Sequence, residues 1–450
     1  MGKELLFAAM RHESVERIPW VPFSGIHAGF LKGYSSKEVL QDKNKLIESL
    51  LEVNRVYAPD GQPVVFDLQV EAEILGCELT WREDTPPMVS SHPLDKVKHI
   101  PHELPTENDG RLPMILSAMR EMKTLVGETT ALYGLITGPF TLASHLRGTD
   151  IFLDMYDEPK YVEDLLSYCT DVAKSIAKMY VKAGMDVIAI VDPMVSQIST
   201  EHFNEFLTKP YISIFKDIRA QAAFSSFFVC GDAMRNIEAM CQTSPDSISI
   251  DENINIKEAK EISDKYNVTI GGNIQLTVTM LHGTQLANMK AVVDILDACG
   301  TKNLIISPGC DMPFSTPIDN VIAASFAVHN PAEARKMLVG YTGSLDLDDI
   351  RVTLPDYTHL ERPFVEVFTL DSSSCAACGY MLEMVVAAKK ELRDAFDYVE
   401  YKFTKLENIK RCIEMKVKHL PSLYMDGKLI YSSLIPDKKE LIDIILGARR

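Results

Sequence analysis

Short apolar runs alternate with helix-forming segments over most of this chain, and this alternation constrains its fold more than any other feature. Eight runs of apolar or β-branched residues are present: Ile18–Phe23, Val64–Asp67, Leu132–Thr137, Val187–Asp192, Ser226–Cys230, Ser247–Ile250, Val268–Asn273 and Leu304–Ser307. Segments with helical periodicity, such as Pro159–Ala183 and His202–Ala222, lie between most of them. Strands that alternate with helices form parallel sheets, and eight repeats favour a closed (β/α)8 barrel over an open sheet. We therefore expect residues 1–340 to form a TIM barrel.

Polar side chains follow these runs where a barrel enzyme carries its active site. They are Asp67, Thr137, Asp192, Cys230, Asp251, Asn273 and Cys310. The carboxyl ends of parallel barrel strands meet at one face, so these side chains are expected to converge. Asp67 and Asp192 are candidate catalytic carboxylates, whereas Asn273 and His27, which follows the first run, are candidate substrate-binding residues. The alternative interpretation is that strands end in polar residues because turns follow.

Two of these strand ends carry a cysteine, Cys230 in SFFVCGD and Cys310 in SPGCD. Two thiols at the carboxyl ends of two strands suggest one site assembled from both, and thiolates are soft ligands for metal ions. A pair of buried, inert thiols is one alternative. A disulfide is another, and a reducing compartment disfavours it. We favour the metal-thiolate interpretation.

A different pattern begins at Phe364, after a stretch at 341–363 that is rich in Asp, Thr and Pro and is typical of a linker. Residues 364–450 read as strand, CxxC, helix, strand, helix, hairpin and helix, with Leu420-Pro421 before the hairpin. This order resembles thioredoxin and glutaredoxin domains. The resemblance implies a reactive Cys375 at a helix N-terminus, a resolving Cys378 and a substrate-binding Pro421. The alternative is a decayed redox fold kept as a docking module.

Composition excludes some classes of function. The formal net charge is −17, so binding to nucleic acid is not expected without a basic cluster, and none is apparent. No stretch is apolar enough to predict a membrane span. The amino-terminal residues do not resemble a signal peptide, and we expect a cytoplasmic protein. We interpret Glu71 and Glu73 as a solvated surface pair.

The barrel segment resembles the uroporphyrinogen decarboxylase superfamily. The residues that carry the resemblance are ERIPWVPF, VEAEILGCEL, GPFTLASHL, SIDENINIKEAKEI, GGNI and SPGCDMPFSTPIDN. Within the superfamily the chain is more similar to the methylcobalamin:thiol methyltransferase branch, in which a His-x-Cys and a second Cys hold zinc. Cys230 and Cys310 match the two cysteines, and Phe228 stands at the histidine position. Candidates for the third zinc ligand are Asp232, Asp251, Glu252, His27 and His145, and Glu252, in the IDEN segment, is preferred.

The resemblance implies that the protein transfers a methyl group from a methylated corrinoid protein to a small thiol acceptor through a zinc-thiolate site. One rival is a carboxy-lyase of the uroporphyrinogen decarboxylase type. That rival fits less well, because the first loop at 20–34 contains no arginine to offset the charge of a polyanionic porphyrinogen. The second rival is a non-catalytic corrinoid or tetrapyrrole binder whose redox domain maintains the bound cofactor.

Overall fold

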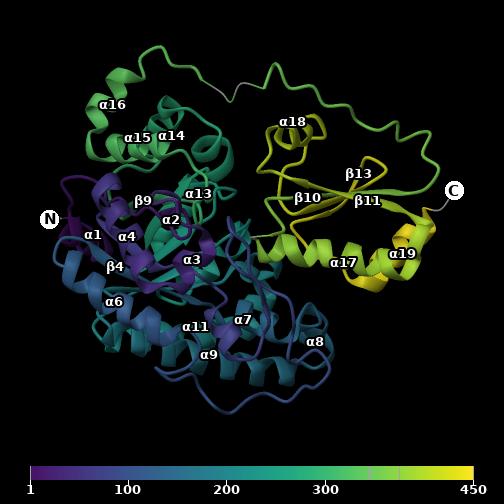
Figure 1. The fold of residues 1–450 in the computed structure, drawn as a ribbon, viewed down its shortest axis with the longest axis horizontal. Coiled ribbons are helices and arrows are strands. Elements are labelled where there is room, and N and C mark those ends of the chain that lie inside the picture. Colours follow the sequence, from purple (N-terminus) through teal and green to yellow (C-terminus); the bar gives the residue numbers. More distant parts are fainter. Residues whose placement is uncertain (1, 344, 346, 374, 449–450) are drawn as a thin grey trace. The chain divides into compact units, whose positions relative to one another are not determined.

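The computed structural model describes residues 2–343, 345, 347–373 and 375–448, and the chain divides into two units, residues 1–344 and 345–450. Figure 1 labels the helices and strands of both units. Within the described residues no helix is both long enough and apolar enough to cross a membrane. Each unit has its own sheet and its own core.

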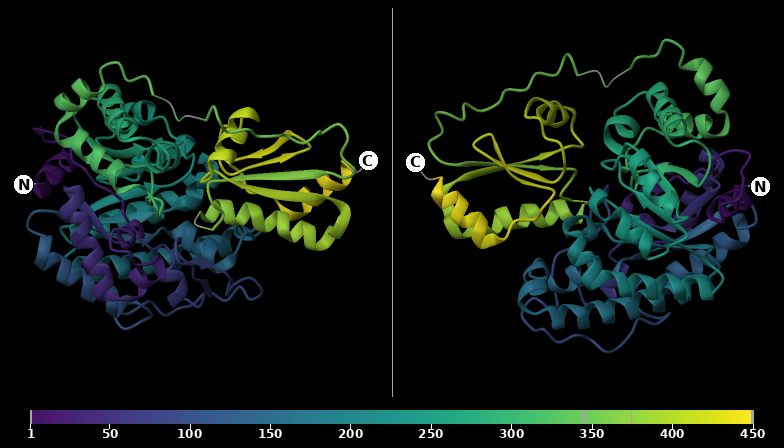
Figure 2. Two further views of the ribbon diagram at one scale, coloured as in Figure 1. Left: turned by 45° about the horizontal axis from the view of Figure 1, so that its top comes forward. Right: turned by 180° about the vertical axis from the view of Figure 1, so that it is seen from behind.

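A curled sheet of seven parallel strands forms the centre of the first unit, and its strand order is β1-β4-β5-β6-β7-β8-β9. The strands are β1 (Gly61–Val65), β4 (Ala131–Thr137), β5 (Val187–Val191), β6 (Phe224–Val229), β7 (Ser247–Ile250), β8 (Thr269–Ile274) and β9 (Leu304–Pro308). Helices of the same unit lie around the outside of this sheet (Figure 2). The predicted α/β class and the parallel pairing are confirmed.

The first apolar run does not form the eighth strand that its sequence predicts. Trp20 makes a single parallel bridge to Ile306 of β9. Its carbonyl accepts hydrogen bonds from the backbone N–H groups of Asp60 and Gly61 at the start of β1, so the run still lies between β9 and β1. The reason is local: Pro19 and Pro22 flank the bridge, and proline has no N–H to donate to a ladder.

The helices of the first unit follow the strands in the expected alternation. They are α1 (Gly2–Met10), α2 (His27–Phe30), α3 (Ser36–Gln41), α4 (Lys43–Tyr57), α5 (Val70–Ile74), α6 (Leu112–Val126), α7 (Pro139–Arg147), α8 (Ile151–Asp157), α9 (Pro159–Lys182), α10 (Thr200–His202), α11 (Thr208–Ala220), α12 (Ile237–Gln242), α13 (Ile256–Lys265), α14 (Gln285–Cys299), α15 (Ile318–His329) and α16 (Pro331–Met337). A two-stranded ribbon, β2 (Leu79–Thr80) with β3 (Met88–Val89), interrupts the alternation between α5 and α6.

Aromatic and aliphatic side chains of several strands form the core that supports the carboxyl ends of the sheet. Phe23, Phe66, Tyr133 and Phe228 are buried in one cluster with residues of α1, β4, β5 and β9. The ring centroids of Phe23 and Phe228 are 4.8 Å apart, and those of Phe66 and Phe228 are 5.8 Å apart. Such rings bury large apolar areas and contribute strongly to core stability.

The second unit contains a four-stranded mixed sheet in the order β11-β10-β12-β13. Its elements are β10 (Phe364–Thr369), α17 (Ala376–Leu392), β11 (Asp397–Lys402), α18 (Leu406–Glu414), β12 (Ser422–Met425), β13 (Lys428–Ser432) and α19 (Lys438–Gly447). β10 pairs in parallel with β11 and antiparallel with β12. The order of strands and helices is the one that the sequence predicts.

Candidate active site

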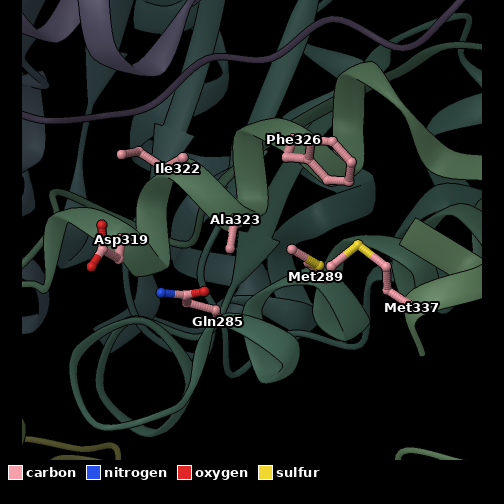
Figure 3. Close-up of a pocket in the computed structure, with 7 residues that line it drawn as sticks. All are labelled: Gln285, Met289, Asp319, Ile322, Ala323, Phe326 and Met337. Atoms are coloured by element: carbon pink, nitrogen blue, oxygen red, sulfur yellow. The ribbon is translucent and has the colours of Figure 1, made fainter. Parts of the chain in front are cut away.

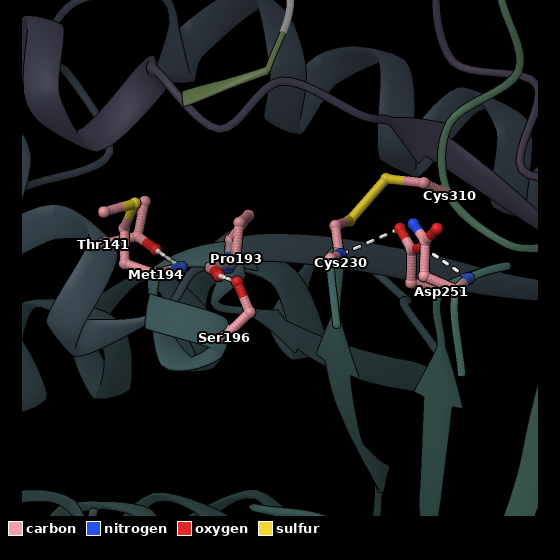
Figure 4. The surroundings of a disulfide bond; sticks show 9 residues. Thr141, Pro193, Met194, Ser196, Cys230, Asp251 and Cys310 are labelled. Carbon is pink, nitrogen blue, oxygen red and sulfur yellow. Dashed lines mark hydrogen bonds between the residues drawn. A yellow bond between two sulfur atoms is a disulfide. The ribbon is translucent and has the colours of Figure 1, made fainter. Parts of the chain in front are cut away.

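The two cysteines at the strand ends are joined to each other. Cys230 follows β6, Cys310 follows β9, and their sulfur atoms form a disulfide with the Cα atoms 6.1 Å apart (Figure 4). The structure therefore brings the two residues together, whereas the expectation that a disulfide is the disfavoured state is wrong for this structure. A disulfide can form between cysteines on different strands when their Cα atoms are close enough, and the separation of 6.1 Å lies within the usual range.

Hydrogen bonds from the neighbouring strand end position the Cys230 loop. The backbone N–H of Gly231 donates to Oδ2 of Asp251, which follows β7, over 2.8 Å (Figure 4). The other oxygen of Asp251 accepts hydrogen bonds from the backbone and side chain of Asn253. Burial raises the pKa of Asp251, and the nearby Asp232 carboxylate adds to the rise. Asp251 therefore serves as an acceptor that holds two loops at the carboxyl edge of the sheet.

The donor set around the disulfide does not fit a zinc ion. Phe228, at the expected histidine position, is fully buried in the aromatic cluster against which both cysteines pack. The predicted substitute Glu252 is partly buried, and its carboxylate accepts a hydrogen bond from the backbone N–H of Leu276. Within the described residues no three His, Cys, Asp or Glu side chains are grouped to hold a metal ion. Zinc needs at least three protein ligands, and here two are paired with each other and none replaces the third.

Asp192 is the predicted catalytic carboxylate that lies deepest in the fold. It is fully buried after β5 and accepts hydrogen bonds from the backbone N–H groups of Phe140 and Thr141, the Thr141 hydroxyl and the Tyr211 hydroxyl. Burial raises the pKa of Asp192 to about 6, and these hydrogen bonds oppose the rise. The carboxylate thus caps the N-terminus of α7 and orients its first turn.

Asp67, the other predicted catalytic carboxylate, is held in a buried ion pair. Nη1 of Arg111 lies 2.6 Å from Oδ2 of Asp67, and the side chain of Asp67 is 0% exposed. Arg111 also donates from Nε to Glu73 over 2.7 Å and stacks on the Trp81 ring, with its guanidinium carbon 5.0 Å from the ring centroid. The pair connects the end of β1 with the start of α6.

The predicted substrate-binding residues His27 and Asn273 also make structural bonds. His27 Nδ1 lies 2.8 Å from the Phe314 carbonyl, and Nε2 lies 2.7 Å from the Tyr57 hydroxyl. Burial lowers the pKa of His27 to about 4, so the neutral ring donates from Nδ1 and accepts from Tyr57. The side-chain amide of Asn273 donates to the carbonyls of Asp251 and Ile254. Both residues hold loops of the carboxyl edge in place.

Two acidic residues near this edge were not expected there. Glu71 is 1% exposed, so the interpretation of Glu71 as half of a solvated pair is wrong. Its carboxyl group accepts hydrogen bonds from the Thr137 hydroxyl over 2.8 Å and from the Thr137 N–H over 3.3 Å. Asp311, beside Cys310, has a buried Oδ1 that accepts no hydrogen bond from any described residue, and burial raises the pKa of Asp311 well above the usual range. Glu71 lies in the VEAEILGCEL motif and Asp311 in the SPGCD motif, but the sequence alone does not distinguish these buried carboxyl groups from acidic residues on the surface.

We predict that the free energy of unfolding of the barrel falls as the pH rises from 4.5 to 7, because the buried Glu71 must then lose its proton. Burial raises the pKa of Glu71 to about 7 from 4.5, so the folded state holds the proton more tightly than the unfolded chain. The stability associated with the protonated group is present below pH 4.5 and is lost as the pH passes through 7. Glu71→Gln is expected to unfold at the same urea concentration as the wild type at pH 4.5 and to be more stable by about 2–3 kcal/mol at pH 8.5. The exposed Glu78→Gln is the control, and equal shifts in both variants would contradict the prediction.

In the second unit the CxxC motif lies at the start of α17. Cys375 is half-buried, and its sulfur accepts the backbone N–H of Cys378 over 3.4 Å. Cys378 is 1% exposed, and burial together with the neighbouring Cys375 raises its pKa well above the usual range. Pro421, the third predicted residue, precedes β12, and its carbonyl accepts the Ser433 N–H. One partly accessible thiol is thus paired with one enclosed thiol.

A separate pocket lies among α14, α15 and α16 and has a volume of about 260 Å³. Figure 3 shows Asp319 and Gln285 toward one end of it and Phe326 and Met337 toward the other. Its remaining lining residues are Met289, Ile322 and Ala323. None of these seven residues was predicted to carry chemistry.

Comparisons with known proteins match the sequence of the first unit. A family model described as uroporphyrinogen decarboxylase (URO-D) matches residues 1–331. Methylcobamide:CoM methyltransferase MtbA of Methanosarcina acetivorans is 28% identical over 331 residues, which cover 71% of this chain and 95% of that protein. Its counterpart in Methanosarcina mazei is 29% identical with the same coverage. A uroporphyrinogen decarboxylase of a Wolbachia sp. (subsp. Brugia malayi) is 26% identical over 299 residues, 64% of this chain and 82% of that protein.

Solved structures show the same barrel. A methyltransferase from Methanosarcina mazei has a TM-score of 0.67 and 23% sequence identity, and the match covers 75% of this chain and 99% of that one. A B12-independent methionine synthase from Shewanella sp. W3-18-1 has a TM-score of 0.52 and 12% identity, with 72% of this chain and 99% of that one covered. At these identities the likeness concerns the fold.

Proposed function

Because the chain belongs to the uroporphyrinogen decarboxylase family, we propose that its barrel transfers a methyl group from a methylated corrinoid protein to a small thiol acceptor. The observation that carries the proposal is the pair of cysteines from two distant strand ends, whose Cα atoms are 6.1 Å apart at the carboxyl edge of the barrel. Barrel enzymes place their chemistry at this edge. The methylcobamide:CoM methyltransferases, similar over 95% of their length, support the choice of reaction class.

The reaction is a nucleophilic displacement at carbon. The acceptor thiol loses its proton to solvent, its sulfur attacks the methyl carbon, and a carbon–sulfur bond forms while the cobalt–carbon bond breaks. The electron pair of that bond stays on cobalt, which leaves as Co(I), and the product is a methyl thioether. No step is assigned to zinc, because Phe228 fills the position of one ligand and the two cysteines are bonded to each other.

We also propose that the second unit is a thioredoxin-like redox domain. The half-buried Cys375 at the N-terminus of α17 supplies the attacking thiol, because it is the more accessible of the two, and the enclosed Cys378 supplies the resolving thiol. A docking module would need neither sulfur atom. Here both cysteines are present, and the backbone N–H of Cys378 donates to the sulfur of Cys375. The element order of β10, α17, β11, α18, β12, β13 and α19 supports the assignment.

The carboxy-lyase alternative is less favoured. A uroporphyrinogen decarboxylase is also among the relatives, but the first loop of this chain, residues 20–34, lacks arginine. A porphyrinogen that carries several carboxylates would meet an acidic protein without cations to offset the repulsion. The non-catalytic binder has no observation of its own in its favour.

Methyl transfer can be tested directly with the full-length protein. We expect the enzyme, reduced with a thiol-free phosphine, to consume methylcobalamin in the presence of 2-mercaptoethanesulfonate and to form the methyl thioether, measured by absorbance and mass spectrometry. A chelator present throughout is expected to leave the rate unchanged, and heat-inactivated protein is the control. Release of CO2 from a porphyrinogen would support the lyase instead. Binding of the corrinoid without a product from any thiol acceptor would support the binder, and either result would overturn the proposal.

A further inference from the structure

The barrel disulfide differs from the other sulfur atoms of its unit. Cys230 and Cys310 are half-buried at the carboxyl edge and pack on the aromatic cluster of Phe23, Phe66 and Phe228. Three other cysteines of the barrel are fully buried, and burial raises the pKa of each: Cys77, Cys169 and Cys241. Reactive thiols are partly exposed, whereas enclosed thiols of high pKa are inert. The disulfide is therefore placed where an exchange reaction can occur, at the carboxyl edge of the sheet.

The same chain carries a thiol pair suited to that exchange. Cys375 is half-buried at the first turn of a 17-residue helix, and Cys378 lies one turn behind it with its sulfur also accepting the Leu370 N–H over 3.4 Å. Lys402 donates to Asp371 over 2.6 Å and to the Ser373 hydroxyl over 2.7 Å, which holds the loop before the motif. An accessible attacking thiol followed by an enclosed resolving thiol is the arrangement that completes disulfide exchange.

We propose that Cys230–Cys310 is a second redox centre, which the Cys375–Cys378 dithiol opens by thiol–disulfide exchange. The Cys375 thiolate attacks one sulfur of the barrel disulfide, forms a mixed disulfide and releases the other barrel cysteine as a thiolate, which takes up a proton. Cys378 then gives up its proton and attacks Cys375, so that a Cys375–Cys378 disulfide forms and the second barrel thiol is released. Two electrons move from one pair to the other. An external dithiol reductant restores the Cys375–Cys378 pair.

The residues that make the site unsuitable for zinc are compatible with a reversible disulfide. A site with two cysteines and a phenylalanine in place of the third ligand cannot keep its thiols apart on a metal, and the two sulfur atoms are free to bond to each other. Opening the bond returns two thiols to the carboxyl edge. The inference rests on the proposed redox competence of the second unit and does not depend on methyl transfer.

The exchange can be trapped covalently. In full-length Cys378→Ser the mixed disulfide cannot be resolved, so we expect a peptide cross-link between Cys375 and either Cys230 or Cys310 after acid quenching, alkylation and mass spectrometry. Cys375→Ser and the double variant Cys230→Ser/Cys310→Ser are expected to show no such cross-link. In the wild type, one equivalent of dithiothreitol is expected to open the barrel disulfide at least ~10-fold faster than in Cys375→Ser. Cys299→Ser, which removes another half-buried thiol of the barrel, is expected to match the wild-type rate.

A parallel assay separates the two proposals. Reduction of insulin disulfides by the wild type reports the redox competence of the second unit alone. Two results would overturn the inference and leave the redox domain intact. The first is insulin reduction by the wild type without a cross-link in Cys378→Ser, and the second is insulin reduction with the barrel disulfide opening equally fast in the wild type and in Cys375→Ser. Free Cys230 and Cys310 thiols in protein purified without a reductant would also overturn it. Absence of both insulin reduction and cross-link would end both proposals.

Discussion

Replacing Arg111 by methionine is expected to lower the free energy of unfolding of the barrel by about 3–5 kcal/mol. The side chain of Asp67 is 0% exposed, and Nη1 of Arg111, at 2.6 Å, balances its charge. Without the guanidinium the carboxylate remains in the interior with two neutral donors of Gln69, its backbone N–H and its side-chain amide, and no positive charge bonded to it among the described residues. An unpaired buried charge costs far more than a buried pair contributes, so the loss exceeds the value of the ion pair itself.

The measurement is urea unfolding followed by circular dichroism, with tryptophan fluorescence as a second probe because both tryptophans of the chain, Trp20 and Trp81, lie in the first unit. Arg120→Met is the matched control, since Arg120 is on α6, the helix that Arg111 precedes, its side chain is 50% exposed, and its Nη2 lies 3.7 Å from the 40% exposed carboxylate of Glu107. Its expected effect is below about 0.5 kcal/mol. The double variant Asp67→Asn/Arg111→Met should recover part of the lost stability, because it removes the stranded charge. Equal losses in Arg111→Met and Arg120→Met would refute the account.

Replacing Asp192 by alanine is expected to lower the free energy of unfolding by about 4 kcal/mol. The change deprives four donors of their acceptor: two backbone N–H groups at the start of α7 and the hydroxyl groups of Thr141 and Tyr211. The site is fully buried, so water cannot replace the lost acceptor without opening the barrel. Helix α7 also loses the negative charge at its N-terminus.

Asp192→Asn separates these contributions, because its amide oxygen still accepts from Thr141 while its NH2 group faces the Phe140 N–H. We expect this variant to lose about half as much as Asp192→Ala. Asp294→Ala is the control, because Asp294 is 58% exposed in an i,i+4 pair with Lys290 and should contribute less than about 0.5 kcal/mol. Thermal unfolding by calorimetry measures all three. A loss in Asp192→Ala no larger than in the control would show that the network does not support α7.

Most of the strands and helices could be predicted from the sequence, because each depends on a pattern of residues that are close together in the chain. Seven of the apolar runs became the strands of one parallel sheet, and the polar residues after β5, β6 and β7 lie at its carboxyl edge. The one missing strand was also foreseeable, since Pro19 and Pro22 remove two donors from the first run. In the second unit, strand periodicity, the CxxC spacing and the glycine at the hairpin turn determined the order of elements.

The roles of individual residues at the edge were harder to predict. Asp192 follows β5 and His27 follows the first apolar run, as active-site residues would, yet their hydrogen-bonding groups are occupied by Phe140, Thr141, Tyr57 and other neighbours. Glu71 alternates with Glu73 as a surface pair would, yet it lies on α5 against Thr137 of β4. A polar residue at a strand end can cap a neighbouring helix as readily as it can bind a substrate, and sequence periodicity does not distinguish the two.

What the sequence determined by itself was therefore most of the strands and helices and the presence of thiols at two strand ends, because each depends on residues close together in the chain. Only the tertiary structure decided that Cys230 bonds to Cys310, that Phe228 completes an aromatic core and that Arg111 neutralises Asp67. Each of these outcomes depends on side chains from strands and helices far apart in the sequence. Their distances, burial and charge balance arise only when the sheet curls and brings its carboxyl ends together.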